Sequence, residues 1–434
     1  FQNIKNGIFG LVINLFISNK IRNNAKTNGY YIRRLSIDYG VDILINTKCV
    51  KLYIDSIVSY YDNFRRVGNS DVKITEDNDE YSESVLSESE EEADGNDLVT
   101  KEIFNSYSDT KIKDVIDVSQ FNRNNLRALF RNSSILKKDI KKYGGLDLLK
   151  GKMVGMYFDE PSSRTYGSFY VAIKKLGGEV LSLNASTSSV KKGESLYDTL
   201  KCFEAYCDLV IVRTKMKGAL AQIQNKIKIP IINAGDGSGE HPTQSLLDVF
   251  TIREERGTVN KLVVSIVGDL KYGRTVHSLV RLLSNYNIVF NFVSIDELKL
   301  DSETQNYLDS KNINYNTYSS INDIIDSTDV LYMTRIQYER FTEGVLDKDN
   351  TIKLENVPLK HMPLENESFI KNNLYLTQET LTNAKNNMII MHPLPRNDEI
   401  EASIDSDPRA AYFRQMEHGL YVRMALLQLL IWLL

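Results

Sequence analysis

The segment FDEPSSRTYGSF at 158–169 places hydroxyls and a guanidinium where an apolar run gives way to a helix-like one. Ser162, Ser163, Arg164 and Thr165 stand in the turn, beside the backbone N–H groups that the first turn of a helix leaves unpaired. Such amides, the helix dipole and an arginine together suit a phosphate group. In an isolated segment, a serine N-cap beside a surface arginine is the simpler interpretation. The choice between this and a phosphate site therefore depends on the neighbouring segments.

Two further polar positions follow apolar runs in the same half of the chain. Arg213 comes directly after DLVIV at 208–212, and NAGDGSGEHPTQ at 233–244 places His241 and Gln244 beside a helix start. A single histidine is usually structural. In an open α/β sheet, however, ligands bind at the carboxyl ends of the strands, where all three polar segments are expected to meet. We therefore predict one anion-binding crevice.

The remaining candidates are mostly cationic. The polar loop STSSVKKGES at 186–195 carries Lys191 and Lys192, although an exposed basic loop explains them equally simply. The second half offers Arg274 in VGDLKYGRT, Arg335, Gln337 and Arg340 in MTRIQYER, and Leu394 and Pro395 in MHPLPR. Two arginines and a glutamine at strand ends suit a dicarboxylate, because the guanidinium offers paired donors matched to carboxylate geometry. A surface salt bridge would explain any one of them.

The elements that must position these residues alternate in the βαβ manner from about residue 115. Strands are expected at 152–158, 179–183, 208–212, 229–233, 261–269, 287–295, 329–333 and 387–392. Amphipathic stretches lie between them, a helix at 243–257 is expected to cross between the halves, and 414–434 reads as a final docking helix. The pattern predicts an α/β protein with two parallel-sheet domains joined by crossing helices.

The domain boundaries follow from composition. Residues 1–110 form an N-terminal extension, 111–248 and 249–410 the two sheet domains, and 411–434 the C-terminal helix, which packs back on the first domain. The first 37 residues carry six basic and no acidic side chains, which fits either an organelle-targeting segment or a species-specific extension of a cytoplasmic protein. The Ser- and acid-rich run at 75–97 is typical of a disordered linker.

Composition excludes several classes of function. The net charge is −4, and the chain after residue 97 carries 42 basic against 41 acidic residues, so we expect no nucleic-acid partner. No apolar run is long enough to predict a membrane span. Three cysteines without metal-ligand spacing and five histidines predict no metal site.

Taken together and in order, these motifs resemble the catalytic chain of aspartate carbamoyltransferase, over about 112–430. The resemblance implies transfer of a carbamoyl group from carbamoyl phosphate to L-aspartate in pyrimidine biosynthesis, without a cofactor. It implies the following carbamoyl-phosphate residues: Ser162, Ser163, Arg164, Thr165, Arg213, His241, Gln244, Leu394 and Pro395. Of these, Arg164, Thr165, Arg213 and His241 would act in catalysis, and the aspartate carboxylates would bind Lys192, Arg274, Arg335 and Gln337.

The same resemblance implies a homotrimer with shared sites, in which Ser188 and Lys192 reach into a neighbouring subunit. Glu160 would bridge to Arg274 and Arg340 when the domains close. Three departures from the family pattern are visible: Ser163 stands where threonine is usual, Pro161 stands where a small residue is common, and the stretch between Arg340 and the MHPLPR motif is longer than typical.

Three alternatives remain. An ornithine carbamoyltransferase would share the phosphate side, but HPLPR, RIQ and the lysines of KKGES differ from the acceptor motifs usual there. A dinucleotide-binding dehydrogenase lacks its glycine fingerprint after 261–269, where LKYGRT supplies only one glycine. A non-catalytic scaffold with the same fold is the third, and the intact polar set argues against it.

Overall fold

The computed structural model describes residues 112–184, 193–237, 239–336 and 364–432, together with two short strands, β1 (Leu11–Ile13) and β2 (Asp42–Leu44), which pair in parallel. The chain divides into two units, Phe1–Glu92 and Ala93–Leu434. Most of the N-terminal segment and the acidic run at 75–97 lie outside the described residues, so the predictions made for them stay predictions.

The first sheet of the second unit is fully parallel and four-stranded, in the order β4-β3-β5-β6. Its strands are β3 (Met153–Phe158), β4 (Glu179–Asn184), β5 (Leu209–Thr214) and β6 (Ile231–Asp236). The strand β3 and the first four residues of β5 are continuous apolar runs because both faces of a parallel sheet are covered by helices. The ends of all four lie within three residues of the predicted runs.

The second sheet is also parallel, with five strands in the order β11-β10-β7-β8-β9. Its strands are β7 (Leu262–Val267), β8 (Ile288–Val293), β9 (Tyr315–Tyr318), β10 (Val330–Met333) and β11 (Ile389–Met391). The predicted α/β class with two parallel sheets is therefore confirmed. The sequence did not predict β9, because this edge strand reads YNTY and carries no apolar run.

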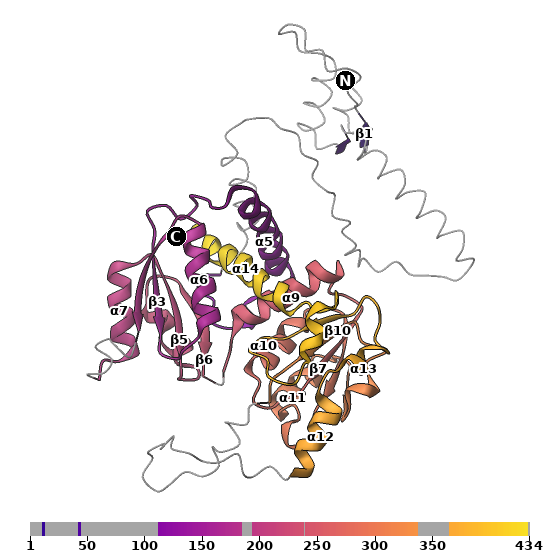
Figure 1. Ribbon diagram of the computed structural model, residues 1–434. Coiled ribbons are helices and arrows are strands. Elements are labelled where there is room, and N and C mark those ends of the chain that lie inside the picture. Colours follow the sequence, from indigo (N-terminus) through magenta and orange to yellow (C-terminus); the bar gives the residue numbers. More distant parts are fainter. Residues whose placement is uncertain are drawn as a thin grey trace. The chain divides into compact units, whose positions relative to one another are not determined.

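Helices cover both sheets (Figure 1). They are α5 (Arg123–Tyr143), α6 (Ser163–Lys175), α7 (Leu196–Tyr206), α8 (Ala219–Ile223), α9 (Pro242–Arg256), α10 (Arg274–Leu283), α11 (Ser302–Ser310), α12 (Leu364–Leu374), α13 (Gln378–Leu381) and α14 (Tyr412–Trp432). Short 3₁₀ turns are η1 (Val118–Gln120), η4 (Gln224–Lys226), η5 (Asp296–Leu298), η6 (Ile321–Asp323) and η8 (Ala402–Ser406). The predicted domain boundaries stay predictions.

The last helix, α14, is buried at every position from Tyr421 to Ile431, which explains why this half of it is almost continuously apolar. It packs against α5, α6 and α9, so it contacts helices from both halves of the predicted fold (Figure 1). Among the described helices, none is long and apolar enough to cross a membrane.

We expect Gly419→Ala to destabilise the protein by about 1–3 kcal/mol, even though alanine is the better helix former. A Cβ at Gly419 would lie 2.7 Å from Nη1 of Arg423 and 2.9 Å from Cδ2 of Leu247, so these two buried side chains would have to shift between α14 and α9. Urea unfolding measures the effect. The matched control is Gly167→Ala in α6, where a Cβ meets no atom within 4 Å; equal losses at both positions would contradict the packing argument.

Candidate functional site

The start of α6 is open to an anion. The strand β3 ends at Phe158, the helix begins at Ser163, and the N-cap side chain of Ser162 makes no capping hydrogen bond. The N–H groups of the first turn therefore have no acceptor from the N-cap residue. Thr165 is buried beneath this turn, and Arg164 extends from it. The local geometry fits the predicted phosphate site.

Two arginines from different parts of the fold, one on β5 and one on α10, meet at Glu160. Nη2 of Arg213, at the end of β5, lies 2.8 Å from Oε2 of Glu160, and Nη1 of Arg274, at the start of α10, lies 3.5 Å from the same oxygen. Arg213 also donates from Nη1 to the backbone oxygen of Ala234 at 3.2 Å. Its pKa is lowered to about 10, first by burial and then by Arg274, so the carboxylate of Glu160 offsets repulsion between the two guanidinium groups.

Gly235 makes this approach of the arginines sterically feasible. Its φ is +119°, a conformation that other residues rarely adopt, and a Cβ there would lie 3.0 Å from Nη1 of Arg213 and 3.6 Å from Cζ of Arg274. The end of β6 therefore passes directly against both guanidinium groups. An alanine at this position would collide with the cationic cluster.

His241 is the N-cap residue of α9 and is only 4% exposed. Burial, followed by the charges of Arg274, Arg213 and Arg423, holds its pKa well below the usual range. The imidazole is therefore neutral at pH 7 and carries one N–H. Nδ1 has no hydrogen-bond partner among the described residues, which leaves a buried polar atom for a ligand.

A pocket joins the phosphate side to the loop that follows β11. It is lined by Arg164, Gln244, Leu394 and Arg423, among others. Leu394 has a φ of +57°, which is unusual for a leucine, and its backbone N–H donates to Nδ1 of His392 at 2.8 Å. The chain thus brings residues about 230 positions apart, Arg164 and Leu394, into one cavity.

The acceptor side is only partly described. Arg335 follows β10 and is half-buried, while Gln337, Arg340, Ser188 and Lys192 lie outside the described residues. Of the predicted Glu160 contacts, the structure contains the one to Arg274, and it adds one to Arg213 that the sequence did not predict.

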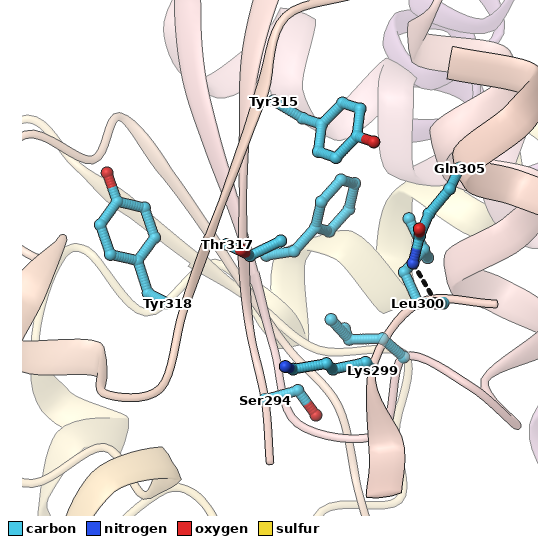
Figure 2. A pocket seen from close by; sticks show the side chains of 9 residues that line it. Ser294, Lys299, Leu300, Gln305, Tyr315, Thr317 and Tyr318 are labelled. Atoms are coloured by element: carbon cyan, nitrogen blue, oxygen red, sulfur yellow. Dashed lines mark hydrogen bonds between the residues drawn. The ribbon is translucent and has the colours of Figure 1, made fainter. Parts of the chain in front are cut away.

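A second hollow lies away from these residues, between β8, β9 and the segment around Leu300 (Figure 2). Its volume is about 30 Å³, room for one or two water molecules. Lys299, on its wall, pairs with Asp296 at 2.7 Å, and Gln305 donates to the backbone oxygen of Leu300 at 2.6 Å. Lys299 is the one cation among its lining residues, so this hollow does not resemble the anion-binding pocket.

The sequence did not single out three buried polar residues at the pocket: Gln415 and Arg423, which line it, and Asp248 behind them. Arg423 donates to Oγ of Ser168 at 3.0 Å and lies over the ring of Phe169, and its Nε has no hydrogen-bond partner in the described part of the chain. A signal did exist, since a charged residue in the apolar run of α14 is costly unless it serves a contact.

Asp248 gives the site a testable pH dependence of stability. Burial raises its pKa to about 7, against the hydrogen bonds from Gln415, Tyr332 and Gln244 and the charge of Arg423, which lower it. The unfolded carboxyl has a pKa of about 3.9, so between about pH 4 and 7 the folded state holds a proton that the unfolded state has released. The proton on Asp248 therefore adds to the free energy of unfolding at low pH, and this contribution is lost as pH rises to about 7.

We therefore expect the stability of the wild-type protein to fall from pH 5 to pH 7.5 more steeply than that of Asp248→Asn, by up to about 1.4 kcal/mol per pH unit. Urea unfolding at the two pH values measures the difference. Parallel curves for the two proteins would contradict the raised pKa.

No cluster of three or more acidic, histidine or cysteine side chains suited to a metal ion occurs within the described ranges. The groups that do converge are guanidinium N–H donors, a neutral imidazole and the start of a helix. Such fixed donors stabilise negative charge on an oxygen as it develops, and they also hold a phosphate.

Comparisons with known proteins agree with this arrangement. Residues 113–254 match the family model described as aspartate/ornithine carbamoyltransferase, carbamoyl-P binding domain, and residues 260–430 match the corresponding Asp/Orn binding domain. The aspartate carbamoyltransferase catalytic subunit of Picrophilus torridus is 40% identical over 322 residues, which cover 74% of this chain and 99% of that protein. The multifunctional protein pyr1-3 of Dictyostelium discoideum is 50% identical over 317 residues, or 73% of this chain.

The chain spans only 13% of the length of that Dictyostelium protein. Among solved structures, the catalytic subunit of M. jannaschii aspartate transcarbamoylase has a TM-score of 0.66 at 39% identity, covering 74% of this chain and 98% of that one. The Trypanosoma cruzi aspartate transcarbamoylase in complex with carbamoyl aspartate and phosphate has a TM-score of 0.64 at 35% identity, covering 74% and 96%.

Proposed function

Because the chain belongs to the aspartate/ornithine carbamoyltransferase family, we propose that it transfers the carbamoyl group of carbamoyl phosphate to L-aspartate. The products are N-carbamoyl-L-aspartate and phosphate, a step of pyrimidine biosynthesis. The observation that carries the proposal is the convergence of the open α6 start, Arg213 and neutral His241 beside a pocket that reaches Leu394. The Trypanosoma cruzi relative, which binds carbamoyl aspartate and phosphate, supports it.

On the donor side, Ser162, Ser163, Arg164 and Thr165 bind the phosphate in this proposal. Thr165, Arg213 and His241 donate to the carbamoyl oxygen. Attack by the amine of aspartate builds negative charge on that oxygen, and donors fixed beforehand stabilise it. The neutral state of His241 matches this role, since one N–H donates without adding a third buried cation to the two arginines.

The carbamoyl amide is assigned to Gln244 and to the backbone of Leu394 and Pro395. The nitrogen–carbon bond forms as the carbon–oxygen bond to phosphate breaks, and the departing phosphate accepts the proton of the amine. The reaction therefore requires neither a covalent nucleophile nor a separate general base from the protein.

On the acceptor side, Arg274 and Arg335 are assigned to the carboxylates of aspartate, with Gln337 and Lys192 completing the pocket. A cationic lining favours a dicarboxylate over ornithine, which carries a second ammonium group. A steady-state assay that offers aspartate and ornithine in parallel tests the choice. Faster turnover with ornithine would reject aspartate, and no turnover with either would favour the scaffold alternative.

We also propose that the active unit is a homotrimer in which Ser188 and Lys192 complete a neighbour's site. Mixing inactive Lys192→Ala and Arg274→Ala chains should then restore activity, because one hybrid interface carries both native residues. A measurable recovery, up to about a quarter of the sites, is expected from random mixing of equal amounts, with one intact interface in each mixed trimer. Activity that stays at background while mass measurement shows subunit exchange would contradict shared sites.

A further inference from the structure

A single buried carboxylate lies behind the pocket and links three elements. Asp248, on α9, is 0% exposed. Its Oδ1 accepts from Nε2 of Gln244 at 2.8 Å and from Nε2 of Gln415 at 2.6 Å, and its Oδ2 accepts from the hydroxyl of Tyr332 at 2.8 Å. Gln415 belongs to α14 and Tyr332 to β10, so the carboxylate connects α9 with the final helix and the second sheet.

The contact with Asp248 decides which end of the Gln244 side chain faces a ligand. A carboxylate oxygen only accepts, so it must face the NH₂ group of the side-chain amide. The oxygen Oε1 is then the atom left for the pocket that Gln244 lines. Without Asp248, the side-chain amide of Gln244 could exchange the positions of its oxygen and nitrogen at little cost in free energy. The hydrogen bond to Asp248 prevents this flip.

The second contact extends to the loop after β11. Oε1 of Gln415 accepts from the backbone N–H of His392 at 2.9 Å, which independently requires its Nε2 to face Asp248. His392 in turn accepts from the N–H of Leu394 at Nδ1 and donates from Nε2 to Glu399 at 2.8 Å. The conformation of Leu394, with its positive φ, is thereby tied to the same carboxylate.

We propose that Asp248 is a positioning residue that selects a carbamoyl over an acyl phosphate, by fixing Gln244 directly and Leu394 through Gln415. This inference rests on the proposed function. A carbamoyl group ends in NH₂, which donates two hydrogen bonds. In this proposal they go to two oxygens that Asp248 holds in position: Oε1 of Gln244 and the backbone oxygen of Leu394. Acetyl phosphate has the same shape with a methyl group there, which leaves both oxygens unpaired.

The arrangement is insensitive to the protonation of Asp248. Since its pKa is raised to about 7, the carboxyl is partly protonated at neutral pH. A proton on Oδ2 faces the hydroxyl of Tyr332, which can accept as well as donate, and Oδ1 still receives both amide groups. The neutral side chain of asparagine can take the same arrangement, with its NH₂ toward Tyr332, and so serves as the conservative variant.

The experiment measures the KI of acetyl phosphate as a competitor and the KM of carbamoyl phosphate in one carbamoyl-aspartate assay on the full chain. The ratio KI/KM should fall about 10-fold in Asp248→Ala, the loss expected for about one hydrogen bond. The ratio should fall in Gln415→Leu by at least about threefold, because this variant breaks the chain of hydrogen bonds from Asp248 to Leu394 but keeps the contact between Asp248 and Gln244. It should stay within about twofold in Asp248→Asn, which keeps both amide contacts.

Tyr332→Phe is the matched control, because it removes the third hydrogen bond to the same carboxylate without touching either amide. A role in folding alone would move KI and KM together and leave the ratio unchanged. An unchanged ratio in Asp248→Ala and Gln415→Leu, or an equal fall in Tyr332→Phe, overturns the proposal. If Asp248→Ala does not fold, Gln415→Leu decides in the same way.

The wild-type protein separates this inference from the function on which it rests. If it makes no carbamoyl aspartate, both the proposed function and the role of Asp248 are rejected. If it makes carbamoyl aspartate and the variants keep the wild-type ratio, only the role of Asp248 is rejected.

Discussion

Arg164→Ala is expected to lower kcat/KM for carbamoyl phosphate by about 10³-fold, the loss typical of removing one charged donor from a reacting anion. Arg164 extends from the first turn of α6, where the N-cap residue leaves the backbone N–H groups without a side-chain acceptor. The helix start alone binds an anion weakly in water. The guanidinium adds paired donors and a full charge as the phosphate leaves.

The control is Lys174→Ala, which removes a cation from the last turn of the same helix. Lys174 pairs with Glu179 at 3.0 Å on the surface, where such a pair contributes little. Its loss should leave kcat/KM within about twofold. Should the two variants lose activity to a similar extent, or Arg164→Ala lose less than about tenfold, Arg164 would not be the phosphate clamp.

The strands that carry the site could be predicted because they are buried on both faces. A parallel strand such as β3 or β5 must then be apolar throughout, and the polar residue at its end stands out. Arg213 was recognised in this way. The edge strand β9 has no such requirement: its residues are half-buried or exposed, and hydrogen bonds to β8 hold it rather than a pattern of side chains.

Asp248 and Gln415 could not be identified from the sequence for a different reason. Asp248 and Gln415 are 167 positions apart, and each is an ordinary polar residue in its own helix. Their role depends on where α14 packs against α9, and no local pattern encodes that contact. Arg423 was the better clue, since a charge within an apolar helical run must find partners when it is buried.

The contact between Glu160 and Arg213 could not be predicted either. From the family resemblance, Glu160 was expected to reach only the arginines of the second half, Arg274 and Arg340. In the structure, Asp159 donates from its backbone to the oxygen of Arg213 at 2.9 Å, as β3 and β5 continue side by side past their ends. This register places the next residue, Glu160, against the guanidinium of Arg213.

Glu160 therefore makes two separate contacts, one in each half of the proposed site. It neutralises Arg213, which is buried in the donor half, and it contacts Arg274, which we assign to aspartate. Without the carboxylate, the repulsion between the two guanidinium groups is no longer offset, and Arg213 loses the partner of its Nη2. The contact to Ala234 would still hold Nη1 in place.

Glu160→Gln should therefore lower kcat by about 10²-fold and raise the KM for aspartate, while the affinity for phosphate changes by less than about threefold. The glutamine fills the same space but supplies no charge, so the two arginines move apart and the oxyanion donor is displaced. Kinetics with both substrates, and phosphate titration, measure the three quantities. Glu179→Gln, at the surface pair with Lys174, is the control. If the KM for aspartate stayed constant while phosphate binding collapsed, Glu160 would serve the donor half alone, and its link to Arg274 would have no part in closing the site.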